Sequence, residues 1–233
     1  HTPTGSLTGR VPGCPPYNAA MANLITLSRL LLLIVVVAIA YRPPAAWQFI
    51  NVVLLILVFV TDGLDGYVAR RRNETSLFGA LFDIAGDRIV ELTMWIVLAD
   101  LRLVPVWVPI VFVIRGTIVD TIRGSYAARA GESPFAMLAT PLGRWLVGGR
   151  FMRILYAVVK ATAFCWLLLL LPFPVTFPVV WADWGTLLTA IGQGLVYVAT
   201  GLCVARGLPV IAEFVYAERE AILGRAAARR TGA

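Results

Sequence analysis

Four aspartates lie close together in an apolar part of the chain and could hold divalent cations. Asp62 and Asp65 are three residues apart, and Asp83 and Asp87 are four apart. On a helix, either spacing puts both carboxylates of a pair on one face. Carboxylate oxygens suit hard cations such as Mg²⁺ or Mn²⁺, and two ions would neutralise four charges that are otherwise costly to desolvate. The pattern predicts a two-metal site for phosphoryl transfer, with the cations bridging oxygens of a diphosphate.

The two aspartate pairs must be carried by neighbouring helices. A short polar segment, 71–76, separates them, so they could converge from two antiparallel helices. The alternative is a structural hairpin, in which the acids are capped or paired with nearby arginines: Arg70, Arg71, Arg72 and Arg88.

The composition is that of a membrane protein. Of 233 residues, 59% are hydrophobic and only 14% are charged, which is far less charge than a soluble domain carries. The length suffices for one domain. The net charge of +7 comes from arginines that flank apolar stretches. This placement favours anionic lipid headgroups as partners and argues against nucleic acid.

Six apolar stretches have about the length of a membrane-spanning helix, about 20 residues. We predict an all-α integral membrane protein with six transmembrane helices, the last bent near Gly207 and Pro209. The predicted spans are 24–41, 47–70, 77–99, 104–127, 151–171 and 187–214. Residues 1–20 are predicted to be a disordered leader or an artificial remnant, 21–216 the membrane domain, and 217–233 a basic tail.

Arginines in the loops predict the orientation. If both termini are cytoplasmic, only Arg42 and Arg102 face outside. The inside segments then hold twelve arginines: Arg10, Arg70, Arg71, Arg72, Arg123, Arg129, Arg144, Arg150, Arg219, Arg225, Arg229 and Arg230. Because positive loops stay in the cytoplasm, the aspartates would line a polar cavity that faces the cytoplasm. We expect a multi-pass protein of a bacterial plasma membrane.

A longer pattern around the aspartates resembles a known family signature. Every fixed position of the CDP-alcohol phosphotransferase signature is filled by Asp62-x2-Asp65-Gly66-x2-Ala69-Arg70-x8-Gly79-x3-Asp83-x3-Asp87. The resemblance implies that all four aspartates bind metal and that Asp87 is also the general base, which takes the proton from an acceptor hydroxyl. It also implies a homodimer.

The same resemblance implies a set of nucleotide contacts. Gly66, Arg70 and Ser76 match residues that contact the CDP moiety, and we place Ala69 and Gly79 beside them. The opening of the first helix, from Asn23 to Arg29, is similar to a segment found in many members, so Asn23 and Thr26 could hydrogen-bond the nucleotide. The alternatives are helix capping for Asn23 and Thr26 and tight helix packing for the two glycines.

Basic residues within the later apolar stretches predict an acceptor pocket. Arg115 and Arg123 are eight residues apart, hence near one helical face, and Arg153 and Lys160 lie deep in the next stretch. Such cations could bind a phosphorylated alcohol. The alternative is ordinary positive charge at the cytoplasmic surface, which fits Arg144 and Arg150 as well as a binding role does.

The segment 114–124 resembles a stretch of phosphatidylglycerophosphate synthases but departs from it. Gly116 and Gly124 replace two glutamates, and Asp120 replaces a serine. We expect an enzyme that transfers the phosphatidyl group of CDP-diacylglycerol to an alcohol and releases CMP. Glycerol 3-phosphate is the first choice of acceptor, inositol phosphate the second, and phosphatidylglycerol, as in cardiolipin synthases, the third. A cation transporter or a non-enzymatic scaffold are the alternatives from other classes.

Overall fold

The computed structural model describes residues 16–72, 77–130 and 143–231, and helices make up nearly all of them. No β-strand occurs in these ranges. The all-α class predicted from the sequence is therefore confirmed. The described part excludes the side chains of 16–25, 62–72, 77–81, 83, 126–130, 144, 217–218 and 220–231.

Each of the six apolar stretches folds as a helix. The long helices are α1 (Pro16–Ala40), α2 (Ile50–Arg72), α3 (Leu77–Asp100), α4 (Trp107–Ala130), α6 (Arg150–Leu170) and α8 (Pro178–Thr231). Shorter elements connect them: η1 (Ala46–Phe49), the π-helical η2 (Arg144–Gly148) and α7 (Phe173–Thr176).

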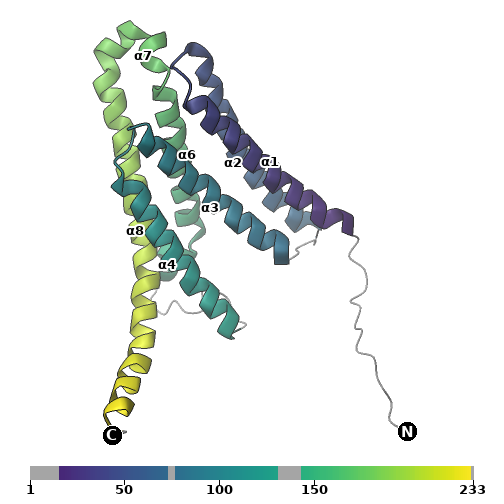
Figure 1. Ribbon diagram of the computed structural model, residues 1–233, viewed down its shortest axis with the longest axis vertical. Coiled ribbons are helices and arrows are strands. Elements are labelled where there is room, and N and C mark those ends of the chain that lie inside the picture. The colour runs from purple at the N-terminus through teal and green to yellow at the C-terminus, as the bar shows by residue number, and fades with distance from the viewer. Residues whose placement is uncertain (1–15, 73–76, 131–142, 232–233) are drawn as a thin grey trace.

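The long helices form an elongated bundle in which α1 begins and α8 ends at the same end (Figure 1). Side chains also join the connections at the opposite end. The Tyr41 hydroxyl, just after α1, donates a hydrogen bond to the Asp100 carboxylate at the end of α3 (2.6 Å). The ring of Phe49 in η1 lies 6.1 Å from that of Phe177, just after α7.

The core is built around α3. This helix packs against α1 on one side and α4 on the other, while α6 packs against α2 and α8. The fully buried Trp95 of α3 contacts the rings of Phe112 and Phe164, each with a centroid distance of 4.6 Å. Aromatic contacts at this spacing add to the stabilisation from burial. They hold α3, α4 and α6 in one register.

The last helix is much longer than predicted. α8 has 54 residues, so at 1.5 Å per residue it is about 80 Å long, whereas a bilayer core is about 30 Å thick. It continues through Pro209, near which the sequence predicts a bend. A proline inside a membrane helix is tolerated because neighbouring groups compensate for the lost backbone hydrogen bond.

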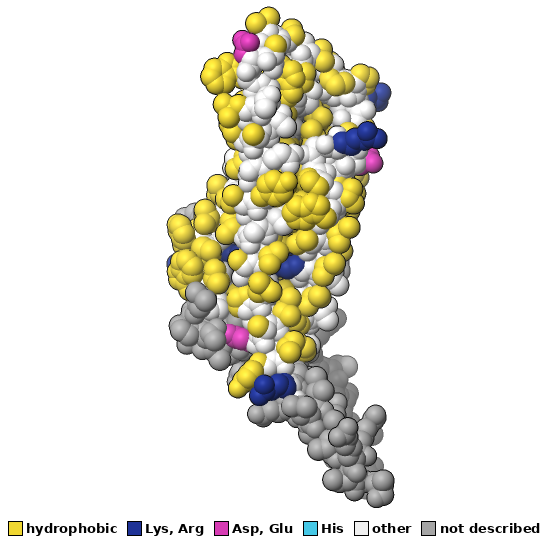
Figure 2. All heavy atoms as spheres, turned by 90° about the vertical axis from the view of Figure 1, so that its left-hand side faces the viewer, with side chains coloured by type: hydrophobic (Ala, Val, Ile, Leu, Met, Phe, Trp, Pro, Cys, Tyr) yellow, Lys and Arg dark blue, Asp and Glu magenta, His cyan; other side chains and the backbone are white. Residues whose placement is uncertain are grey.

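The surface is strongly apolar. Figure 2 shows hydrophobic side chains spread over most of the face it displays, with few charged ones between them. Two helices of the described part are long and apolar enough to cross a membrane, Arg150–Leu170 and Pro178–Tyr216. Shorter apolar helices are Thr26–Ala40 and Ala46–Thr61. An apolar surface of this extent indicates a lipid environment.

Candidate active site

Residues from α1, α2, α3 and α6 line a cavity of about 140 Å³. The two basic residues among those that line it, Arg29 and Lys160, come from α1 and α6. The two acids, Asp87 and Glu91, come from successive turns of α3. The remaining lining residues are apolar: Val58, Phe59, Val90, Ala157 and Phe164. A cavity with opposite charges and low-polarity walls strengthens the electrostatic interactions within it.

Asp87 faces this cavity beside a buried arginine. The Arg29 side chain is 1% exposed, and its Nη1 lies 3.2 Å from Oδ1 of Asp87. The Asp87 side chain itself is 59% exposed, so its carboxylate stays open to an incoming group. Arg29 sits in an apolar run of α1, where a buried cation needs such an anionic partner.

Gly86 makes this contact possible. A Cβ added at Gly86 would lie 2.6 Å from Nη2 of Arg29 and 2.9 Å from Cγ2 of Thr26. Both distances are shorter than real Cβ atoms tolerate. Because Gly86 has no side chain, the Arg29 guanidinium can lie in a slot against its backbone. Gly86 directly precedes Asp87 in the chain.

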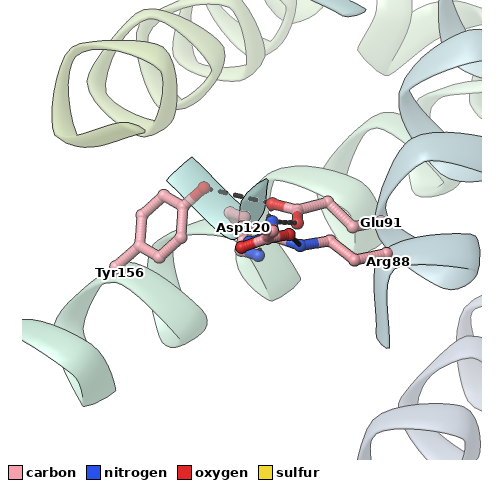
Figure 3. A network of polar contacts seen from close by, with 5 residues as sticks. Arg88, Glu91, Asp120 and Tyr156 are labelled. Atoms are coloured by element: carbon pink, nitrogen blue, oxygen red, sulfur yellow. Dashed lines mark hydrogen bonds and ion pairs between the residues drawn. The ribbon is translucent and has the colours of Figure 1, made fainter. Parts of the chain in front are cut away.

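Glu91 is the centre of a polar network that joins three helices (Figure 3). Its side chain is 7% exposed. From α6, Lys160 Nζ donates to Oε1 of Glu91 (2.6 Å), and the Tyr156 hydroxyl donates to the same oxygen (3.1 Å). From α3, Arg88 Nη1 donates to Oε2 (2.8 Å). Because a buried carboxylate is costly unless fully paired, these three donors account for its presence.

Arg88 also ties α3 to α4. Its Nε and Nη2 donate to the two carboxylate oxygens of Asp120, at 2.7 and 2.9 Å. Gly116 lies one helical turn before Asp120, and a Cβ there would meet Nη1 of Arg88 at 3.7 Å. A glutamate at position 116, as in the phosphatidylglycerophosphate synthase pattern, would therefore face the same guanidinium. Asp120 supplies the carboxylate one turn later.

Because positions 116 and 120 both lie near Arg88, we can predict the effect of moving the carboxylate from position 120 to position 116. Asp120→Ser removes the two-oxygen partner of Arg88 and should lower the melting temperature by roughly 2–4 °C, the shift expected for ~1 kcal/mol in a chain of this size. Adding Gly116→Glu to Asp120→Ser should restore most of the loss. Thermal unfolding of the purified variants measures both effects. Equal melting temperatures for the single and double variants would contradict the shared role of positions 116 and 120.

A second group of cations lies where α4, α6 and α8 meet. Arg206 of α8 is 6% exposed, and its Nε and Nη1 have no hydrogen-bond partner within the described part of the chain. Its Nη2 donates to the Val147 carbonyl (3.3 Å), and its guanidinium lies 5.4 Å from the ring centre of Tyr156. Arg115, Arg123 and Arg153 are near enough to repel it. We call these four residues the arginine cluster.

Gly207 positions one member of the arginine cluster. A Cβ on Gly207 would lie 2.7 Å from Cγ and 3.0 Å from Nε of Arg115. The Arg115 side chain of α4 therefore lies directly on the backbone of α8. This Nε has no hydrogen-bond partner among the described residues. Buried guanidinium nitrogens without hydrogen-bond partners attract an anion strongly.

Gly207→Ala should displace Arg115 and weaken the binding of an anionic acceptor. We expect the KM for a phosphorylated alcohol to rise about tenfold, which is ~1.4 kcal/mol. Gly201→Ala is the matched control on the same helix, because a Cβ there meets nothing within 4 Å. Steady-state kinetics with varied acceptor measures both. A KM that changes equally in the two variants would show that the Arg115 contact has no role in binding.

The structure places the residues predicted from the sequence as follows. Asp87, Arg115, Arg123, Arg153 and Lys160 are on the helices expected, with Asp87 and Lys160 at one cavity. Thr26 is buried beside Gly86. Ser76 lies outside the described residues. The surroundings of eight further positions lie outside the described part, although their backbones belong to α1, α2 or α3: Asn23, Asp62, Asp65, Gly66, Ala69, Arg70, Gly79 and Asp83.

Several polar and charged residues of the site could not be assigned a function from the sequence. The sequence alone assigns no role to Glu91, Tyr156 or Arg206. It offers Arg88 only as an ion-pair partner of the aspartates and Asp120 only as a departure from the synthase pattern. The available signal was a charge inside an apolar helical stretch, which by default marks a functional position. The pairing of these charges depends on contacts between helices and has no periodicity that a single sequence displays.

Of the four aspartates predicted to bind metal, only Asp87 has a described side chain, and it is an oxygen ligand of the kind that a hard divalent cation takes. Asp87 presents an open carboxylate, and a positive group, Arg29, already lies against it. Position 83 is one turn earlier on α3, and position 62 is one turn after the cavity-lining Val58 on α2. Oxygen-only ligands suit Mg²⁺ and Mn²⁺. The side chains described in this structure form no group of three or more metal-ligating residues.

Comparison with protein families identifies the class of this protein. The family model for CDP-alcohol phosphatidyltransferase matches residues 19–191, which run from the first turn of α1 to the first part of α8. The chain belongs to the CDP-alcohol phosphatidyltransferase family. The resemblance seen in the aspartate pattern is thereby confirmed.

Curated relatives narrow the resemblance further. Proteins named CDP-diacylglycerol–glycerol-3-phosphate 3-phosphatidyltransferase are similar to this chain in several bacteria. The protein of Wigglesworthia glossinidia brevipalpis is 29% identical over 112 residues, which are 47% of this chain and 60% of the relative. That of Bacillus subtilis is 28% identical over 138 residues, 54% and 70% of the two chains. With Haemophilus influenzae the identity is 27% over 109 residues, 46% and 59%. The matched part thus spans about three-fifths of the first two bacterial relatives, those of Wigglesworthia and Haemophilus.

Proposed function

We propose that this chain transfers the phosphatidyl group of CDP-diacylglycerol to a hydroxyl of glycerol 3-phosphate and releases CMP. Family membership and the names of the relatives support the reaction. The choice of a phosphorylated acceptor is based on the arginine cluster. In it, Arg206 is 6% exposed and keeps two nitrogens without a partner among the described residues. A phosphate monoester supplies the acceptor oxygens that these nitrogens lack.

In the proposed mechanism, Asp87 is the general base. Its carboxylate accepts the proton of the acceptor hydroxyl, and the resulting oxygen attacks the phosphorus that carries diacylglycerol. A new phosphorus–oxygen bond forms there. The bond from the same phosphorus to the bridging oxygen of CMP breaks, and CMP leaves with the electron pair. Arg29, packed against Gly86, would hold the Asp87 carboxylate at the cavity throughout.

Four aspartates would hold two Mg²⁺ or Mn²⁺ ions: Asp62, Asp65, Asp83 and Asp87. When bound, such ions neutralise charge on a diphosphate and on its leaving group. We further propose that the residues around them bind the CDP moiety: Asn23, Thr26, Gly66, Ala69, Arg70, Ser76 and Gly79. Arg115, Arg123 and Arg153, joined by Arg206, would bind the phosphate of the acceptor, while Lys160 borders the cavity that receives its hydroxyl end.

The proposed setting is a six-span membrane protein. The fold supports it, since the six long helices in the described part carry an extensively apolar surface. We propose that residues 21–216 form the membrane domain, that both termini and the polar cavity face the cytoplasm of a bacterium, and that two copies form a homodimer. The lipid tails of CDP-diacylglycerol would then remain in the bilayer while its nucleotide reaches the aspartates.

CMP release from CDP-diacylglycerol by the detergent-solubilised protein tests this function. Glycerol 3-phosphate, inositol phosphate, phosphatidylglycerol and serine are supplied one at a time with Mg²⁺, and EDTA is the control. We expect metal-dependent CMP release with glycerol 3-phosphate. CMP release with only inositol phosphate or only phosphatidylglycerol would change the proposed acceptor but leave the proposed reaction in place. No release with any acceptor, from protein that is folded and monodisperse, would overturn the proposal.

A further inference from the structure

Basic residues next to Asp87 and basic residues of the arginine cluster differ in how they are neutralised. At the cavity, the Lys160 ammonium group forms an ion pair with Glu91 at 2.6 Å. The Arg88 guanidinium forms ion pairs with both Glu91 and Asp120. In the arginine cluster, Arg206 and Arg115 keep buried nitrogens without partners in the described part of the structure. The site therefore has one neutralised end and one positive end.

Tyr156 lies on the border between the two ends. Its hydroxyl donates to Glu91, and its ring contacts Lys160 Nζ at 4.4 Å and the Arg206 guanidinium at 5.4 Å. An acceptor that bridges this border could place one group in each region. Its anionic group would go to the positive end, because the basic groups around Glu91 are already ion-paired and leave no free cation there.

We propose, building on the proposed function, that Glu91 is the positioning residue that determines how the acceptor enters the site. By neutralising Lys160, Glu91 leaves no free lysine cation at the cavity for the phosphate of the acceptor. The phosphate of the acceptor is directed to the arginine cluster, and its uncharged hydroxyl end is directed to Asp87. Lys160 then acts as a donor held in place by Glu91 and not as a phosphate ligand.

Glu91→Gln tests this role with inorganic phosphate as the probe. The amide keeps the size of the side chain and an oxygen for Lys160 but removes the negative charge, so Lys160 becomes an available cation. We expect phosphate to bind about tenfold more tightly than to the wild type, measured by calorimetry without metal or CDP-diacylglycerol. The double variant Glu91→Gln, Lys160→Gln should return to the wild-type affinity. Asp183→Asn, an exposed acid of α8, is the matched control and should change nothing.

A purely structural role for Glu91 predicts a different result. Glu91→Gln would then lower the melting temperature without any gain in phosphate affinity, and that outcome would overturn the proposal. Lys160→Gln in the wild-type background gives a second test that does not depend on the folding of the Glu91 variant. We expect kcat to fall about tenfold while the KM for glycerol 3-phosphate changes less than about twofold.

A tenfold rise of that KM in Lys160→Gln would mean that Lys160 binds the acceptor phosphate directly, against the proposal. The two levels of inference remain distinguishable. If the wild-type protein releases no CMP, the proposed reaction fails, but the phosphate measurements still decide whether Glu91 controls anion binding, because they use neither substrate nor metal.

Discussion

Asp87→Asn is expected to reduce CMP release by about 10³-fold, within the 10²–10⁴ range of general acid–base catalysis. The substitution keeps the size of the side chain but removes the group that accepts the proton of the acceptor hydroxyl. It also removes the charge that faces the buried Arg29 guanidinium 3.2 Å away. Initial rates of CMP release at saturating CDP-diacylglycerol and Mg²⁺ measure the effect.

Asp183→Asn is the matched control for this experiment. Asp183 is an exposed acid on α8, remote in sequence from the site, and its variant should keep the wild-type rate. Gel filtration and thermal unfolding establish that both proteins remain folded. If Asp87→Asn retained more than about a tenth of the wild-type rate, Asp87 would not be the general base.

The second large effect is expected at a residue with no side chain. Gly86→Ala puts a Cβ 2.6 Å from Nη2 of Arg29, so the guanidinium must move away from its position beside Asp87. A misplacement of about 1 Å at a group that positions the reacting atoms can cost about 10²-fold in rate. We therefore expect kcat to fall by about that factor, measured in the same CMP assay.

Gly124→Ala separates this effect from a general intolerance of helical substitutions. A Cβ at Gly124 meets nothing within 4 Å, and alanine favours a helix over glycine by about 1 kcal/mol. Its rate and melting temperature should equal or exceed those of the wild type. Wild-type turnover by Gly86→Ala would show that catalysis does not need Arg29 in the Gly86 slot.

The helices follow from local sequence to a large extent. Apolar stretches of about 20 residues are recognised without any partner, and all six form helices. The predicted ends of the helices are less accurate. The last helix begins at Pro178 and runs to Thr231, well beyond the predicted 187–214. Hydropathy reports where lipid is favoured, whereas a helix continues into polar sequence as long as its backbone hydrogen bonds are satisfied.

Two local signals in the sequence, short spacing and a charge inside an apolar stretch, predict Asp87 and Lys160, which share one cavity. Asp87 was named because it lies four residues from Asp83, and it faces a cavity together with Lys160 of α6. The assignments of metal ligands, nucleotide contacts and acceptor residues remain predictions. Most of the metal ligands and nucleotide contacts have no described side chain. Arg206 shows the limit clearly, since one arginine in a long apolar helix gives no indication of which cations surround it.

By itself the sequence determined the class of the protein: an all-α, strongly apolar chain with the aspartate pattern of the CDP-alcohol phosphatidyltransferase family. Only the tertiary structure decided which charges are neutralised and which stay available. Glu91 and Lys160 are 69 residues apart, yet their ion pair is 2.6 Å long. The physical reason is that side-chain types and helical periodicity act over a few residues, while burial and the pairing of charges depend on how separate helices pack.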